Sequence, residues 1–208
     1  MMGFWGAAPL SGCAAAGGAA SADATDSAAA ATALEPLVAA PPMRISGQRV
    51  VVLPAQAVSG LPEELAERVE AELLFALAER APQVEWVPPA ELERALRRSP
   101  GLAGDPRTLP DDPLVHHRER RAVEPLAGEL RRFSALMDAR LLLLPRTVAW
   151  VAGGEGGSVR VSAAVIDSRS GNVVWWGDAA GEPSRTPDAR AVASAAEALA
   201  RRMLASRE

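Results

Sequence analysis

The sequence predicts an α/β (α+β) fold, in which a mixed β-sheet carries helices on both faces. Short apolar runs of strand length, at residues 49–53 and 84–87, alternate with segments of helical period in the first half of the folded region. Residues 141–176 then contain three consecutive strand patterns separated by turn sequences. The resulting order, β-α-β-α-α-β-β-β-α, interleaves helices with the early strands and ends in a meander, which is typical of a mixed sheet.

The first strand and the first helix follow from local composition. Residues 49–53 are short, rich in valine and followed by Pro54, as expected of a buried strand. A helix is predicted from Pro62, because proline suits the first helical position and the two glutamates after it favour the helix dipole. Its apolar stripe indicates packing on the sheet, and a seam for a partner helix is the alternative. The stripe consists of Leu65, Val69, Leu73 and Leu77.

Prolines delimit the next elements. Pro82 ends the first helix, and Pro88 ends the strand pattern Val-Glu-Trp-Val that lies between the two prolines. The predicted elements are a strand at 84–87, a short helix at 91–98, an irregular segment at 99–121 and a helix at 123–137.

The meander begins with four consecutive leucines at residues 141–144, which suit a strand covered on both faces. Residues 159–166 alternate in polarity with the period of two of a half-buried strand, and the glycines at 153–157 before them predict a hairpin turn. In the last strand, Trp175 and Trp176 point to opposite faces. One is expected in the core. Helices on both faces favour burial of the other as well, and a contact with a partner protein is the alternative.

The final helix is predicted to start with Thr186 as its N-cap and Pro187 as its first residue. Its apolar face comprises Val192, Ala195, Ala196, Leu199 and Met203.

Composition limits the classes of function. The chain has 208 residues and a net charge of −4, so nothing indicates a nucleic-acid partner. All 22 basic residues are arginines. No stretch of about 18 apolar residues predicts a transmembrane helix. The single cysteine, Cys13, excludes an internal disulfide and a multi-cysteine metal site.

A lipidation motif lies near the N-terminus. Leu10, Ser11, Gly12 and Cys13 resemble the bacterial lipobox, in which cleavage before the cysteine frees a thiol that receives a diacylglycerol and an amine that is acylated. The 12 residues before Cys13 contain no arginine or lysine, although a signal peptide begins with a charged region. We therefore expect residues 1–12 to be the remnant of a signal peptide that begins further upstream, and the alternative is that the motif is accidental.

The segment after the cysteine has the composition of a tether. Residues 13–43 are almost wholly alanine, glycine, serine, threonine and proline, so they cannot bury a core and are expected to be disordered. Residues 44–208 form the single globular domain. The residue after the cysteine is Ala14 and not aspartate, and the resemblance to enterobacterial lipoproteins then implies the outer membrane, facing the periplasm.

The ordered set of motifs resembles one family of envelope domains. Residues 50–54 with the following helix, residues 84–96, residues 138–144 and the hairpin at 165–175 resemble the N-terminal domain of the Tol-system propeller protein. They also resemble the curli-secretion lipoproteins and the lipoprotein activators of penicillin-binding proteins. The resemblance spans about residues 49–204 and implies an envelope protein that binds other proteins and is not an enzyme.

One segment contains residues with chemical potential. The 105–121 loop has two adjacent histidines and several carboxylates, but adjacent histidines diverge and chelate a metal poorly together. No Gly-x-Ser-x-Gly elbow or His-Glu-x-x-His motif supports catalysis, so we expect no catalytic residue, no metal and no cofactor. A solvated loop is the main interpretation, and a partner-binding loop is the alternative. The residues concerned are Asp105, Asp111, Asp112, His116, His117 and Glu119.

These observations predict a membrane-anchored bacterial envelope lipoprotein that acts as a non-enzymatic, protein-binding accessory or assembly factor. Its partner is an envelope protein. One alternative is a structural subunit that self-assembles as a homo-oligomer. The other is a hydrolase that uses the 105–121 loop.

Overall fold

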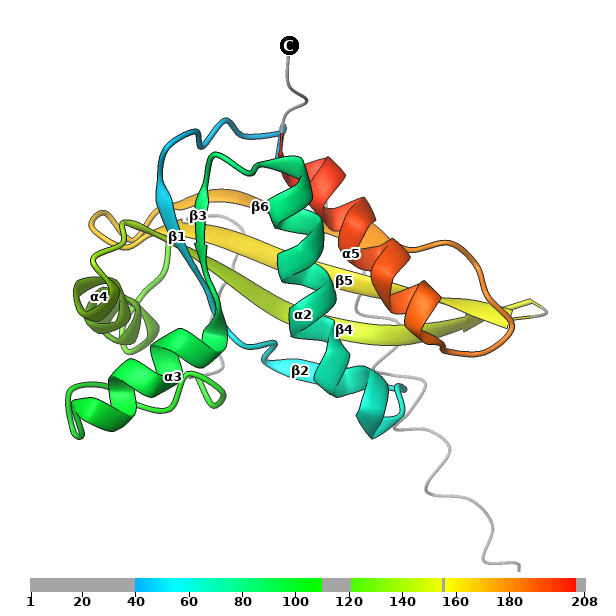
Figure 1. Cartoon of the computed structure of the whole chain (residues 1–208), viewed down its shortest axis with the longest axis horizontal. Coiled ribbons are helices and arrows are strands. Elements are labelled where there is room, and N and C mark those ends of the chain that lie inside the picture. The colour runs from blue at the N-terminus through cyan, green and yellow to red at the C-terminus, as the bar shows by residue number, and fades with distance from the viewer. Residues whose placement is uncertain (1–39, 110–120, 155, 205–208) are drawn as a thin grey trace, which may run out of the picture. The chain divides into compact units, whose positions relative to one another are not determined.

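The computed structural model describes residues 40–109, 121–154 and 156–204. They form a six-stranded sheet in the order β3-β1-β4-β5-β6, in which β2 pairs with β4 outside this path (Figure 1). The strands are β1 (Arg49–Val52), β2 (Ala57–Ser59), β3 (Glu85–Val87), β4 (Leu141–Gly153), β5 (Gly156–Asp167) and β6 (Val173–Ala180). The helices are α2 (Glu63–Arg80), α3 (Pro89–Arg98), α4 (Leu126–Met137) and α5 (Ala189–Met203). None of the helices in these ranges is both long and apolar enough to cross a membrane.

The sheet is mixed, as predicted. β1 runs parallel to both β3 and β4, whereas β4, β5 and β6 form an antiparallel meander. β4 is 13 residues long and has a register shift between Pro145 and Thr147. Its first part pairs with β1 and its second part pairs with β2. β2 was not predicted from the sequence, because its three residues are too few to show an alternating apolar pattern.

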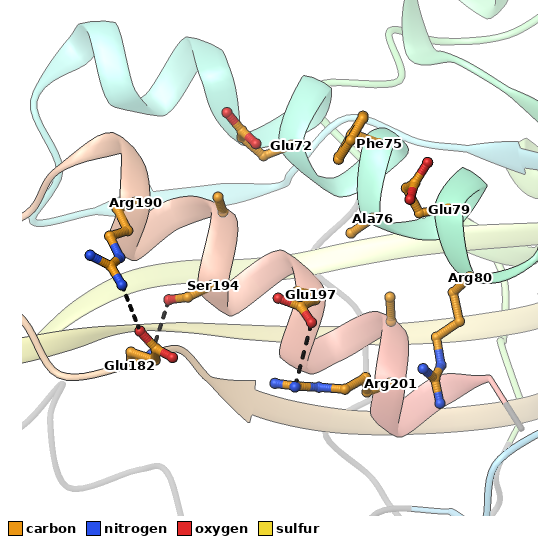
Figure 2. A pocket seen from close by; sticks show the side chains of 12 residues that line it. Glu72, Phe75, Ala76, Glu79, Arg80, Glu182, Arg190, Ser194, Glu197 and Arg201 are labelled. Atoms are coloured by element: carbon orange, nitrogen blue, oxygen red, sulfur yellow. Dashed lines mark hydrogen bonds and ion pairs between the residues drawn. The ribbon is translucent and has the colours of Figure 1, made fainter. Parts of the chain in front are cut away.

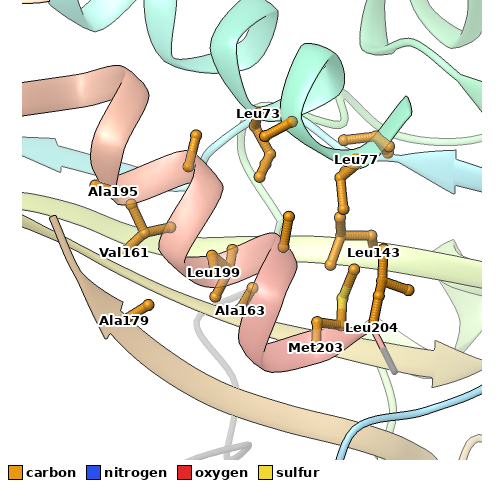
Figure 3. Packing of buried hydrophobic residues seen from close by; sticks show 14 of the residues in the cluster. Leu73, Leu77, Leu143, Val161, Ala163, Ala179, Ala195, Leu199, Met203 and Leu204 are labelled. Atoms are coloured by element: carbon orange, nitrogen blue, oxygen red, sulfur yellow. The ribbon is translucent and has the colours of Figure 1, made fainter. Parts of the chain in front are cut away.

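Helices cover both faces of the sheet, which confirms the predicted layers. Side chains alternate along β4, so Leu141 and Leu143 belong to a core cluster with α2 and α5. Leu142 and Leu144 belong to a second cluster with α3 and α4. Figure 3 shows part of the first cluster, in which the leucines of α2 and α5 meet Leu143 above the sheet.

The hairpin between β4 and β5 is tighter than the glycine pattern predicted. Gly154 has a φ of +50° and lies in the turn, but Gly156 and Gly157 already belong to β5. Gly157 is needed for close packing, because a Cβ there would lie 2.7 Å from the Trp150 indole. Gly157 is therefore required for close packing, whereas Gly154 is required for the turn.

The predicted start of the last helix is wrong by two residues. α5 begins at Ala189, and its N-cap is Asp188, whose carboxylate accepts a hydrogen bond of 2.7 Å from the Ala191 N–H. Thr186 cannot cap the helix because the chain before it is held to the tip of the β4–β5 hairpin. Ser184 and Gly157 exchange two backbone hydrogen bonds of 2.8 Å.

Asp167 fixes the turn between β5 and β6. Its buried carboxylate accepts hydrogen bonds from the guanidinium of Arg140 and from the backbone N–H groups of Arg169 (3.0 Å) and Ser170 (3.2 Å). Burial raises the pKa of this carboxyl, but the hydrogen bonds and the charge of Arg140 together lower the pKa below its ordinary value. The ionised form therefore stabilises the folded turn.

Candidate protein-docking groove

A groove lies between α2 and α5 on the outer side of the helix layer (Figure 2). The two helices lie on the same face of the sheet, and the groove between them has a volume of about 520 Å³. At their C-terminal ends the helices are tied together, because the Arg80 Nε–H donates to the Leu204 carbonyl at 3.3 Å. The rim and floor therefore come from two rigid elements that are far apart in the sequence.

Small side chains make the floor of the groove. Ala76 comes from α2, and Ala193 and Ala200 come from α5. An alanine ends at Cβ, so it leaves room between helices that larger side chains would fill. Below them, Leu73, Leu77 and Leu199 are buried in the core against the sheet (Figure 3). The floor is therefore shallow and firmly supported.

Phe75 is the most exposed large apolar residue among the described ones. It has 66% of its surface exposed, whereas the other exposed large hydrophobics range from 37% to 45%. Figure 2 shows it on α2 between Glu72 and Glu79. Its neighbours in sequence, Leu74 and Ala76, turn towards the core. Aromatic residues, phenylalanine included, are enriched in protein interfaces, so an exposed ring that lines a groove is a candidate contact for another protein.

Ion pairs frame the groove on the α5 side. Arg201 pairs with Glu197 at 3.4 Å, and Arg190 approaches Glu182 at 3.8 Å. Ser194 accepts a hydrogen bond of 3.0 Å from the Glu182 N–H. These groups are exposed, so each pair adds little to stability. Their effect is to place paired, hydrated charge around an apolar centre, which is the anatomy of a protein interface.

The two tryptophans separate as the strand period requires. Trp175 is completely buried in the cluster with α2 and α5, so it is the core member of the pair. Trp176 is half-buried, and its carbonyl accepts a hydrogen bond of 3.0 Å from the Ala40 N–H. Only Trp176 therefore stays a predicted partner contact.

The first part of the 105–121 loop is held to the helices. Arg107 pairs with Glu70 of α2 at 3.0 Å and with Glu93 of α3 at 2.8 Å. Burial lowers the pKa of its guanidinium, but the two glutamates raise it further, so the net shift is upward. Asp105 accepts a hydrogen bond of 2.9 Å from the Arg107 N–H. Its carboxylate thus supports the local turn.

Several predicted residues lie outside the described residues. They are Leu10, Ser11, Gly12, Cys13, Asp111, Asp112, His116, His117 and Glu119. The lipidation motif and the histidine pair therefore stay predictions. Within residues 40–109, 121–154 and 156–204, no group of three or more His, Cys, Asp or Glu side chains is placed to hold a metal ion.

The groove itself was not predicted from the sequence, although a signal for Phe75 was present. The apolar stripe at Leu65, Val69, Leu73 and Leu77 repeats every four residues, and residue 75 falls two positions after one of its members. At about 100° per residue, this step turns a side chain to the opposite side of the helix. A phenylalanine there is off the core face and had to be either exposed or in contact with something else.

Comparisons with known proteins identify similar structures but no family. No protein-family model matches the sequence, and no curated protein sequence matches it. Lipoprotein GNA1162 from Neisseria meningitidis is 17% identical, with a TM-score of 0.41 over 68% of this chain and 85% of its own. The C-terminal domain of LpoB from Salmonella enterica is 14% identical, with a TM-score of 0.41 over 66% of this chain and 84% of its own.

A third similar structure is the PelC dodecamer from Paraburkholderia phytofirmans. It is 16% identical, with a TM-score of 0.42 over 81% of this chain and 96% of its own. All three TM-scores are below 0.5, so we base no functional assignment on these similarities. The resemblance to the Tol-system and curli-secretion proteins stays a prediction from the sequence.

Proposed function

We propose that this chain is a lipid-anchored lipoprotein of the bacterial envelope, whose domain binds another envelope protein through the α2–α5 groove and catalyses no reaction. The exposure of Phe75 is the observation that carries this proposal. Aromatic anchors of this kind dominate binding energy when a partner buries them, and a ring of polar contacts around them excludes water. Phe75 has such surroundings, because paired charges border the groove beside it.

The anchor is proposed from the sequence alone. Cys13 ends the lipobox-like tetrapeptide, and the residues up to 43 have the composition of a flexible tether. Several acyl chains on one cysteine hold a protein stably to a bilayer. A tether of about 30 residues spans roughly 30 Å root-mean-square. We place the domain on the periplasmic side of the outer membrane, where it acts as an accessory or assembly factor.

Photo-crosslinking in cells tests the docking site. Phe75 is replaced by a photoreactive phenylalanine analogue in the full chain, expressed in its native host. Irradiation is expected to give one discrete adduct with a different envelope protein. The matched control places the same analogue at Leu102, which is 45% exposed and is not part of the groove lining. Equal adducts from both positions, or none from position 75, would refute the proposed docking site. An adduct of twice the monomer mass would instead favour the self-assembling subunit.

The anchor has its own test. Wild type and Cys13→Ala, both expressed in the native host, are compared by intact mass and by membrane fractionation. We expect a lipid-sized mass increase and membrane association in the wild type only. Unmodified, soluble protein in both cases would overturn the lipoprotein assignment and leave the docking result untouched.

A further inference from the structure

The acidic charge of the domain is concentrated on α2. Residues 44–208 contain 22 arginines and 23 acidic residues, once Asp23, Asp26 and Glu35 of the tether are set aside. α2 alone holds six of these acidic residues and only two of the arginines, within 18 residues. The helix that carries Phe75 is therefore strongly acidic in a domain that is otherwise slightly basic.

Four of the six glutamates have no cationic partner in the described part of the chain. Glu70 pairs with Arg107, and Glu72 pairs with Arg68 at 3.2 Å. The unpaired ones are all exposed, and they are Glu63, Glu64, Glu67 and Glu79.

Helix stability explains only part of this pattern. Glu63 and Glu64 are in the first turn, where negative charge favours the helix dipole. Glu67 is beyond the first turn, so it gains little from the dipole. Glu79 is next to the last residue of the helix, where negative charge is unfavourable. The position of Glu79 therefore has a cost in stability that folding alone does not explain.

Three of the unpaired glutamates, Glu64, Glu67 and Glu79, share one face of α2 with Phe75. Ala71 and Ala78 are exposed about one turn before and one turn after Phe75. Their methyl groups form a flat apolar surface on both sides of the ring. With a rise of 1.5 Å per residue, Glu67 lies about 12 Å before Phe75 along the axis and Glu79 about 6 Å after it. We call this face, comprising Glu64, Glu67, Ala71, Phe75, Ala78 and Glu79, the acidic stripe. Arg68 also lies on this face, where its charge is paired with Glu72.

We propose that the acidic stripe recognises a basic protein segment, which offers an apolar pocket to Phe75 and arginine or lysine side chains on both sides of that pocket. This inference rests on the proposed function, because it names the chemistry of the partner at the same site. Complementary charge steers association and selects partners, whereas the buried aromatic supplies affinity. A membrane surface does not fit, since anionic lipid headgroups repel glutamates.

The same photoreactive analogue at position 75 tests the charge requirement in the full chain. It is combined with Glu67→Gln and Glu79→Gln, which keep size and hydrogen bonding but remove two charges. We expect the adduct yield to fall about fivefold or more, because rim charges control the rate of association. The control pair, Asp138→Asn and Glu124→Gln, removes the same net charge away from the groove and is expected to leave the yield unchanged.

The outcomes separate the two proposals. If no adduct forms in the parent, the docking site itself fails. If the adduct forms but is insensitive to Glu67→Gln and Glu79→Gln, docking stands and the charge-based inference is refuted. Mapping the crosslinked peptide by mass spectrometry gives a second criterion, since a net acidic or uncharged contact segment would also refute it.

Discussion

The substitution Phe75→Ala tests whether the ring serves binding or folding. About 200 Å² is a typical side-chain area for an aromatic residue, and 66% of Phe75 is exposed. Roughly 70 Å² is then buried, which at about 25 cal/mol per Å² corresponds to about 1.7 kcal/mol. Alanine recovers about 0.5 kcal/mol through its higher helix propensity. We expect a net loss of about 1 kcal/mol in the free energy of unfolding.

Leu73→Ala is the matched control, because Leu73 is on the same helix, two residues earlier, and is 2% exposed. Truncating a buried leucine costs about 2–5 kcal/mol through lost transfer energy and the cavity left behind. Urea denaturation, followed by circular dichroism, measures both variants against the wild type. A loss of more than about 3 kcal/mol for Phe75→Ala would show that the ring holds the fold, and the argument for a docking anchor would then fail.

Three further predictions concern the framework. Asp167→Asn removes the ion pair of a carboxyl group whose pKa is lowered in the folded state. The wild type should be more stable than the variant at neutral pH, and urea denaturation should show this difference shrink as the pH falls below 3.8. A stability difference that persists at lower pH would contradict the role of the ionised carboxylate. Gly181→Ala should destabilise the domain by about 1–3 kcal/mol through overpacking, because the added Cβ would lie 2.7 Å from the backbone nitrogen of Ala195 in α5. An unchanged melting temperature would refute the close packing of residue 181, which directly follows β6, on α5. Asp188→Ala should cost about 1 kcal/mol by removing the N-cap of α5, whereas Thr186→Ala should be nearly neutral, and the reverse result would restore the cap predicted from sequence.

Prediction of the sheet from the sequence was most accurate where a residue pattern is compatible with only one arrangement of strands and helices. Four consecutive leucines cannot all face one side of a strand, so Leu141–Leu144 required apolar cover on both faces, and the structure has it. β2 was not predicted, because it forms by pairing with the second part of the long strand β4 and its own three residues are exposed. The N-cap of α5 was misassigned because Thr186, Pro187 and Asp188 all suit a helix start, and only the contact between Ser184 and Gly157 excludes the first.

The candidate site was harder to predict than the fold, because a groove is made by two helices that the sequence does not place side by side. The sequence pattern predicted the apolar stripe of α2. The opposite face of this helix became a candidate site only because the structure places α5 next to α2. Sequence reasoning instead favoured the tryptophans, of which Trp175 is buried in the core. The lipidation predicted for Cys13 is not tested by the structure, because this residue lies outside the described residues.

The two faces of α2 make binding and folding separable in this protein. Val69, Leu73 and Leu77 face the sheet and are buried, whereas Phe75 and Glu79 face solvent. The period of 3.6 residues keeps the two sets apart, so substitutions on the outer face leave the core intact. An accessory protein benefits from this division, since its docking surface can change to suit a partner without loss of the fold. Variants of the acidic stripe should therefore lose the partner at a cost of about 1 kcal/mol or less in the free energy of unfolding, whereas variants of the inner stripe should cost about 2–5 kcal/mol and lose both.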